Sequence, residues 1–87
     1  MEQIQFKLNE TLKIIGATRN KLSVESKVRS ATILDLASGD TRTIKLETLI
    51  SILNAINEIA TKNGVNHTFG IEDIIEYIPV NEEKKDQ

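Results

Sequence analysis

The stretch TRNKLSVESKVRSATILDLASGDTRTIKLETL, residues 18–49, decides the fold of this chain. Thr18 is a residue type preferred at helix N-caps, and the segment that it opens runs to about residue 26. Residues 27–29 are Lys-Val-Arg, which we interpret as a basic turn. The stretch therefore begins with a short helix that ends in a tight turn.

A second short helix is predicted over residues 30–37, where Ser30 is a candidate N-cap. Ile33 and Leu36 are three residues apart, which is the spacing of the buried face of a helix. Leu22 and Val28 are expected to point inward on either side of the turn. The stretch therefore predicts two short helices joined by a turn, followed by a basic loop and the start of a longer helix.

The order of these motifs resembles the helix-turn-helix of the Cro and lambda-repressor-like (Xre-type) transcriptional regulators. The family pattern runs Thr-Gln-x-x-Leu-Ala, Gly-Val/Ile-Ser, Thr-Ile, Glu-x-Gly and Leu-Glu-Thr-Leu. The matching residues here are Thr18-Arg19, Leu22-Ser23, Lys27-Val28-Arg29, Thr32-Ile33, Ala37-Ser38-Gly39 and Leu46-Glu47-Thr48-Leu49. Arg19, Lys27, Arg29 and Ala37 stand where the family has Gln, Gly, Ser and Glu.

Length and composition favour one small intracellular domain. Eighty-seven residues build a single small core, and the absence of cysteine excludes disulfides. No apolar run approaches the roughly 20 residues of a membrane span, and the N-terminus lacks the pattern of a signal peptide. We expect a cytoplasmic protein with a domain over residues 1–80 and a charged, disordered tail over residues 81–87.

Charge is unevenly distributed along a chain whose net charge is −2. Residues 18–46 hold six Lys and Arg against three acidic residues, whereas residues 47–87 hold three Lys against eight acidic residues. A basic stretch in an acidic protein favours a local contact with a polyanion over a globally attractive field.

The segments outside the central stretch predict three further helices and a short strand. Residues 3–8 alternate apolar and polar side chains, as in a half-buried strand. A helix follows to Ile15, and Gly16 is placed to end it. The alternative is that there is no strand and this helix starts earlier. A wide apolar stripe predicts a long helix over residues 46–62.

The apolar residues Ile71, Ile74, Ile75 and Ile78 predict a short fifth helix over about residues 71–77. The expected fold class is therefore all-α, a five-helix bundle of lambda-repressor-like type. A short two-stranded patch formed by the N-terminus and residues 77–80 is an additional expectation.

Catalysis finds little support in the sequence. The single His67 lies between polar residues of a predicted loop, and the chain has no cysteine and no glycine-rich phosphate loop. Glu72, Asp73 and Glu76 are close in sequence, but they suit the start of a helix better than a metal site. We expect no catalytic residues, no metal, no cofactor and no small-molecule ligand.

The resemblance implies a DNA-binding role in which the second helix of the motif enters the major groove. The residues that it places toward the bases are Arg29, Ser30, Ala31, Leu34 and Asp35. The residues that it places toward the DNA backbone are Thr18, Arg19, Lys21, Lys27, Thr41, Arg42, Thr43 and Lys45. The leading hypothesis is a sequence-specific regulator, phage- or prophage-like, that acts as a repressor or Cro-like switch on double-stranded DNA.

Two alternatives accompany this hypothesis. Leu34 reads no base by hydrogen bonding and Asp35 repels phosphate, which favours a protein-binding module such as an antitoxin or antirepressor partner. For assembly, we expect a homodimer built on Ile59, Val65 and Phe69, which have no obvious partner within the chain; the alternative is that Phe69 folds back and the protein is a monomer.

Overall fold

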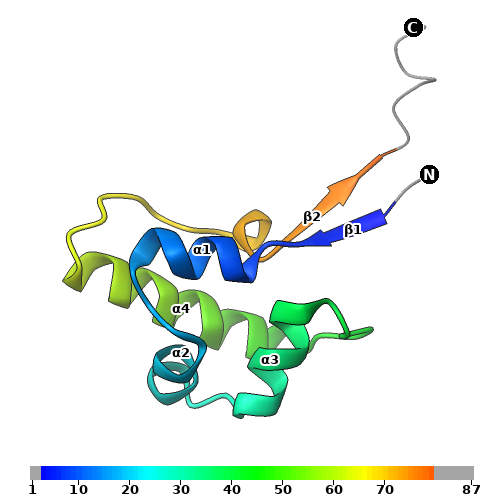
Figure 1. Cartoon of the computed structure of the whole chain (residues 1–87), viewed down its shortest axis with the longest axis horizontal. Coiled ribbons are helices and arrows are strands. Elements are labelled where there is room, and N and C mark those ends of the chain that lie inside the picture. The colour runs from blue at the N-terminus through cyan, green and yellow to red at the C-terminus, as the bar shows by residue number, and fades with distance from the viewer. Residues whose placement is uncertain (1–2, 80–87) are drawn as a thin grey trace, which may run out of the picture.

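The computed structural model describes residues 3–79 of the chain. In chain order the elements are β1 (Gln3–Phe6), α1 (Leu8–Ile15), α2 (Arg19–Ser26), α3 (Ser30–Ser38), α4 (Leu46–Lys62), the single 3-10 turn η1 (Ile71–Asp73) and β2 (Ile75–Ile78). The four α-helices pack together, and β1 and β2 form a ribbon that projects away from them (Figure 1).

The prediction of an all-α, five-helix bundle is wrong, because the described residues form four α-helices and a two-stranded antiparallel sheet. The predicted fifth helix, residues 71–77, is instead η1 followed by β2. Ile75–Ile78 is rich in β-branched and aromatic side chains, which suit a pleated strand. An isolated helix of seven residues is marginal, whereas β1 offers this segment backbone hydrogen-bond partners along one edge.

The ribbon pairs the two ends of the described chain. Gln3 lies opposite Ile78 and Phe6 opposite Ile75, and the Lys7 N–H donates to the Ile74 carbonyl at 2.8 Å. The strand therefore begins at Ile75, two residues before the expected patch at residues 77–80. Residue 80 and the predicted tail, residues 81–87, lie outside the described residues.

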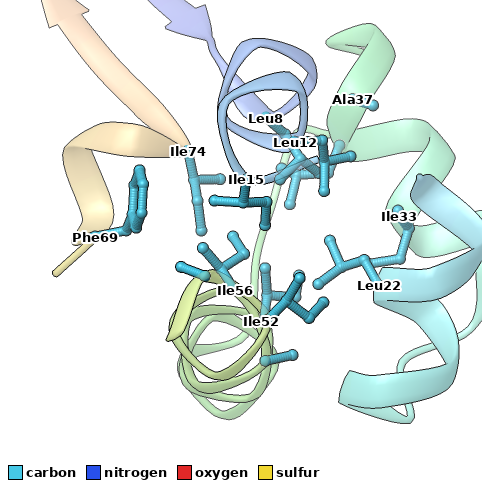
Figure 2. Packing of buried hydrophobic residues seen from close by; sticks show 14 of the residues in the cluster. Leu8, Leu12, Ile15, Leu22, Ile33, Ala37, Ile52, Ile56, Phe69 and Ile74 are labelled. Atoms are coloured by element: carbon cyan, nitrogen blue, oxygen red, sulfur yellow. The ribbon is translucent and has the colours of Figure 1, made fainter. Parts of the chain in front are cut away.

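One apolar core joins the helices to the base of the ribbon. Figure 2 shows Ile52 and Ile56 of α4 facing Ile15 of α1, with Leu22 and Ile33 of the helix-turn-helix on one side. Ile74 and Phe69 close the core on the other side. The fully buried large side chains are Leu8, Ile15, Leu22, Ile33, Leu36, Ile52, Ile56 and Ile74. The helix-turn-helix is thus held on a frame formed by α1 and α4.

The loop after α4 returns to the core and does not form an exposed patch. Phe69 is only 5% exposed and Ile59 is buried, while Val65 is half-buried against the same cluster. The Asn57 side chain holds the loop, since its Oδ1 accepts from the Phe69 N–H at 2.7 Å and its Nδ2 donates to the Phe69 carbonyl at 3.1 Å. The exposed apolar cluster expected at Ile59, Val65 and Phe69 is therefore absent, because Phe69 finds its partner inside its own chain.

Within residues 3–79, no helix combines the length and the apolar character needed to cross a lipid bilayer.

Candidate nucleic-acid interface

The turn between α2 and α3 has a left-handed residue at its first position. Lys27 has φ 62° and ψ 25°, and its N–H donates to the Ser23 carbonyl at 2.9 Å. The Ser23 hydroxyl donates to the Val28 carbonyl at 2.6 Å, and the Ser26 hydroxyl accepts from the Val28 N–H at 3.2 Å. Two serines therefore satisfy the backbone of the turn and fix the angle between the helices.

Lys27→Gly is expected to raise the free energy of unfolding by about 1 kcal/mol. A left-handed backbone costs a non-glycine residue about 1–2 kcal/mol, and glycine avoids this cost but gains entropy in the unfolded chain. Urea denaturation of the two proteins measures the difference. Lys27→Ala, which removes the same charge and keeps the Cβ, is the matched control; equal stability of the Gly and Ala variants would contradict the argument from φ.

The five predicted base-reading residues lie together on the outward face of α3. Arg29 is the N-cap of α3 in backbone geometry, and no side chain closes this cap. Ser30, expected to cap the helix, is instead its first residue, and its hydroxyl lies 3.3 Å from the Ser23 hydroxyl. Ala31, Leu34 and Asp35 are exposed, with Leu34 47% accessible.

A large groove runs along one side of this face, between α3 and the loop that leads into α4. Its volume is about 980 Å³. The charged residues that line it are Lys27, Arg29, Arg42, Lys45, Asp35, Asp40 and Glu47. Thr41 and Thr43 also line it, and Ile44 anchors the loop against the core. The structure thus gathers four predicted cations in one groove, together with three acidic residues.

A smaller hollow lies on the other side of α3, where the helix faces the start of α2. It is lined by Thr18, Arg19, Asn20, Ser30 and Leu34. The Thr18 hydroxyl caps α2, as predicted, by accepting from the Lys21 N–H at 3.0 Å. The N–H groups of Arg19 and Asn20, in the first turn of α2, point out of the helix start.

Lys21 is the predicted backbone contact that the structure does not bring to this face. Its Nζ lies 3.1 Å from Glu25, one helical turn away, and both side chains line a separate hollow toward the end of α4. The hydrogen bond and the charge of Lys21, with a further contribution from Lys62, lower the pKa of the Glu25 carboxyl. Lys21 therefore pairs with a residue of its own helix and lines neither the groove nor the hollow beside α3.

The groove and the hollow also include residues that sequence reasoning did not select. Asn20 shares the hollow with Arg19, and its position as the second residue of a helix capped by Thr18 is the signal that could have identified it. Asp40 and Glu47 lie on either side of the loop residues predicted to contact the DNA backbone. Only the folded structure shows that these two acidic residues line the same groove as Arg42 and Lys45. The chain matches no family model, no curated protein and no solved structure.

Proposed function

We propose that this protein is a sequence-specific DNA-binding transcriptional regulator of the Cro and lambda-repressor-like kind. The observation that carries the proposal is that the groove on one side of α3 and the hollow on its other side both contain arginine side chains and threonine hydroxyls. The major groove, about 12 Å wide, admits one α-helix and has a phosphate chain along each of its edges. A helix flanked by donors on both sides fits that arrangement.

Each hollow suits one of the two phosphate chains. On one side, the N–H groups at the start of α2 and the Arg19 guanidinium form an anion-binding position. On the other side, Arg42 and Lys45 lie in the loop after α3, with Thr41 and Thr43 as hydroxyl donors. Phosphate contacts of this kind fix the register of a protein on DNA and carry no sequence information.

The residues proposed to contact base edges lie at and after the N-terminal end of α3. Arg29 can donate a bidentate pair to guanine, Ser30 can hydrogen-bond a base edge, and Ala31 can meet a thymine methyl group. Asp35 can accept from cytosine N4. Asp35, Asp40 and Glu47 reduce the attraction to phosphate, so binding is expected to depend on the reading contacts more than on charge alone.

Selection of bound sequences from random double-stranded DNA tests the proposed function. Enrichment of a motif with two spaced half-sites is the expected result, because family members often dimerise and read half-sites about one DNA turn, roughly 34 Å, apart. A pool without any enriched motif would overturn the proposal and leave the protein-binding alternative.

Arg29→Ala and Arg42→Ala are expected to weaken DNA binding in different ways. Loss of Arg29 should cost ~1–3 kcal/mol on the preferred site and relax one base position. Loss of Arg42 should weaken binding to all sequences alike and reduce the salt slope by about one unit. Titrations of preferred and scrambled DNA at several salt concentrations distinguish the two effects.

Lys13→Ala is the matched control for these variants. Lys13 is an exposed cation on α1 that lines neither the groove nor the hollow beside α3. Its loss should leave both affinity and salt slope unchanged. If the two arginine variants lose affinity equally on preferred and scrambled DNA, Arg29 is not a base reader.

A second candidate function is a protein-binding module on the same scaffold, and one observation favours it. Leu34 exposes nearly half of its side chain in the hollow beside α2, where a DNA reader would gain more from a polar group. The regulator remains our first proposal, acting as a homodimer in the cytoplasm, because it accounts for the cations on both sides of α3.

A further inference from the structure

A second groove lies between the base of the ribbon and the loop that joins α3 to α4 (Figure 1). Its volume is about 460 Å³, within the range of about 300–1,000 Å³ that is usual for small-molecule sites. Its lining comes from three separate parts of the chain, which are β1, residue 39 with residues 41–44, and Ile75 of β2. No local sequence pattern predicts such a groove, so the sequence alone led to the expectation of no small-molecule ligand.

One wall of this ribbon groove is apolar. Phe6, Ile44 and Ile75 are half-buried and pack on the core, and Ile4 is 49% exposed at the outer end. Ile4 and Phe6 are two residues apart on β1, so their side chains share one face about 7 Å apart. The Phe6 ring closes the inner end against Gly39, where an added Cβ would lie 3.4 Å from the ring. The wall is therefore an elongated apolar strip that is open to water along one side.

The opposite wall of the ribbon groove carries a single charge. Among residues 3–79, Arg42 is the one charged residue that lines this groove, and Thr41 and Thr43 add hydroxyl groups beside it. The three acidic residues near α3 line only the groove proposed to contact DNA. The ion pairs within residues 3–79 are formed by Lys7 and Lys21, so no carboxylate in this part of the chain neutralises the Arg42 guanidinium. The ribbon groove thus complements one negative charge on an apolar body.

We propose that the ribbon groove binds a medium-chain monocarboxylate, an anion whose apolar part is an extended alkyl chain. The chain lies along Ile4, Phe6 and Ile75, and the carboxylate accepts a bidentate pair of hydrogen bonds from Arg42. The planar guanidinium matches the geometry of a carboxylate. An inorganic anion has no part that covers the apolar strip, and a neutral alkane has no partner for the charge, so the two walls together select an amphipathic anion.

The same ligand regulates DNA binding, because residues 41–44 line both the ribbon groove and the groove beside α3. Arg42 is proposed above to contact the DNA backbone, and its guanidinium carries one charge. A carboxylate held in the ribbon groove neutralises that charge and draws the side chain away from phosphate. The ligand therefore lowers the affinity for DNA, and by linkage DNA lowers the affinity for the ligand by the same factor. This regulatory step rests on the proposed function, whereas binding of the carboxylate does not.

Titration calorimetry of the protein without DNA tests the ribbon groove with hexanoate, octanoate and 1-octanol. Octanoate should bind at one site per chain with a Kd below about 1 mM. Hexanoate should bind several-fold more weakly, since each buried methylene group contributes up to about fourfold in affinity. 1-Octanol has an alkyl chain but no charge, and it should bind at least about tenfold more weakly than octanoate, because Arg42 then has no charged partner.

Arg42→Ala and Lys45→Ala distinguish the ribbon groove from the groove beside α3. Arg42 lines both grooves, whereas Lys45 lines only the groove beside α3. Arg42→Ala should raise the Kd for octanoate at least about tenfold, and Lys45→Ala, the matched control, should leave this Kd unchanged.

Ile4→Asp is a second variant that acts on the ribbon groove alone. It places a carboxylate on the apolar strip, where it repels the ligand, and it should also raise the Kd for octanoate at least about tenfold. Ile4 and Arg42 are both exposed, so neither change removes a core side chain. Circular dichroism checks that each variant is folded.

The regulatory step is measured with the DNA sequence that the protein prefers. Saturating octanoate should weaken binding of wild type at least about fivefold and reduce the salt slope by about one unit, the charge of one phosphate contact. Lys45→Ala should show the same response to octanoate. Arg42→Ala should show none, because the side chain that connects the two grooves is gone.

Three results would overturn the inference. They are the absence of saturable octanoate binding up to about 1 mM, 1-octanol that binds as tightly as octanoate, and Arg42→Ala that keeps the affinity of wild type. Octanoate binding without any change in DNA affinity would overturn the regulatory step alone. A protein that binds octanoate but selects no DNA sequence would overturn the proposed function and leave the carboxylate site in place.

Discussion

Phe69→Ala is expected to lower the free energy of unfolding by about 3–5 kcal/mol. The ring is buried against the core, and the backbone on both sides of it is held by the Asn57 side chain. A chain of this length has a total stability of about 4–13 kcal/mol on the usual per-residue scale, so the variant should unfold a large part of the population at moderate temperature. Thermal and urea denaturation followed by circular dichroism measure the loss.

Ile71→Ala is the matched control, two residues along the chain. Ile71 is half exposed in η1, so its truncation should cost no more than about 0.5 kcal/mol, the scale of surface changes. A similarly small cost for Phe69→Ala would mean that the loop does not pack on the core. For the same reason, a charged substitution at Phe69 reports on folding and gives no information on assembly.

Leu36→Ala is expected to destabilise the domain by about 2–5 kcal/mol. Leu36 is only 1% exposed, and with Ile33 it forms the inner face of α3. Its removal leaves a cavity in the core beneath the helix proposed to enter DNA. The denaturation midpoint in urea gives the cost, and DNA binding should fall in parallel with the fraction folded.

Leu34→Ala provides the comparison on the same helix. Leu34 is exposed, so the change should leave stability within about 0.5 kcal/mol of wild type. The two leucines differ by two positions, which on a helix is the difference between the inner and outer faces. Equal costs for both variants would mean that the face of α3 is assigned wrongly.

Local patterns in the sequence are sufficient to predict the helices and the turn that carry the candidate interface, whereas the interface residues themselves follow from the resemblance. The Thr18 cap, the spacing of Ile33 and Leu36, and the polar loop before residue 46 are all decided within a few residues, and the structure has α2, α3 and the start of α4 at those places. The outward face of α3 follows from the same spacing, because burying one face of a helix exposes the other.

The helical stripe of α4 is less completely determined by sequence. Leu46 and Ile50 belong to the apolar stripe by composition, yet both are exposed, whereas Leu49, Ile52 and Ile56 are buried. The sequence gives more apolar residues than one face needs, and only the positions of α1 and α2 select the side that is covered. The spacing of apolar residues therefore identifies the helix, but it does not determine which side of the helix faces the core.

The sequence by itself determined the four helices, the Thr18 cap before α2, the turn between α2 and α3, and the cations near them, because these depend on contacts within one or two helical turns. Tertiary structure decided whether Ile75–Ile78 is helix or strand, since its hydrogen-bond partner is β1, at the other end of the chain. It also decided that Phe69 is buried. Each of these outcomes depends on a competing partner that becomes available only when the chain has folded.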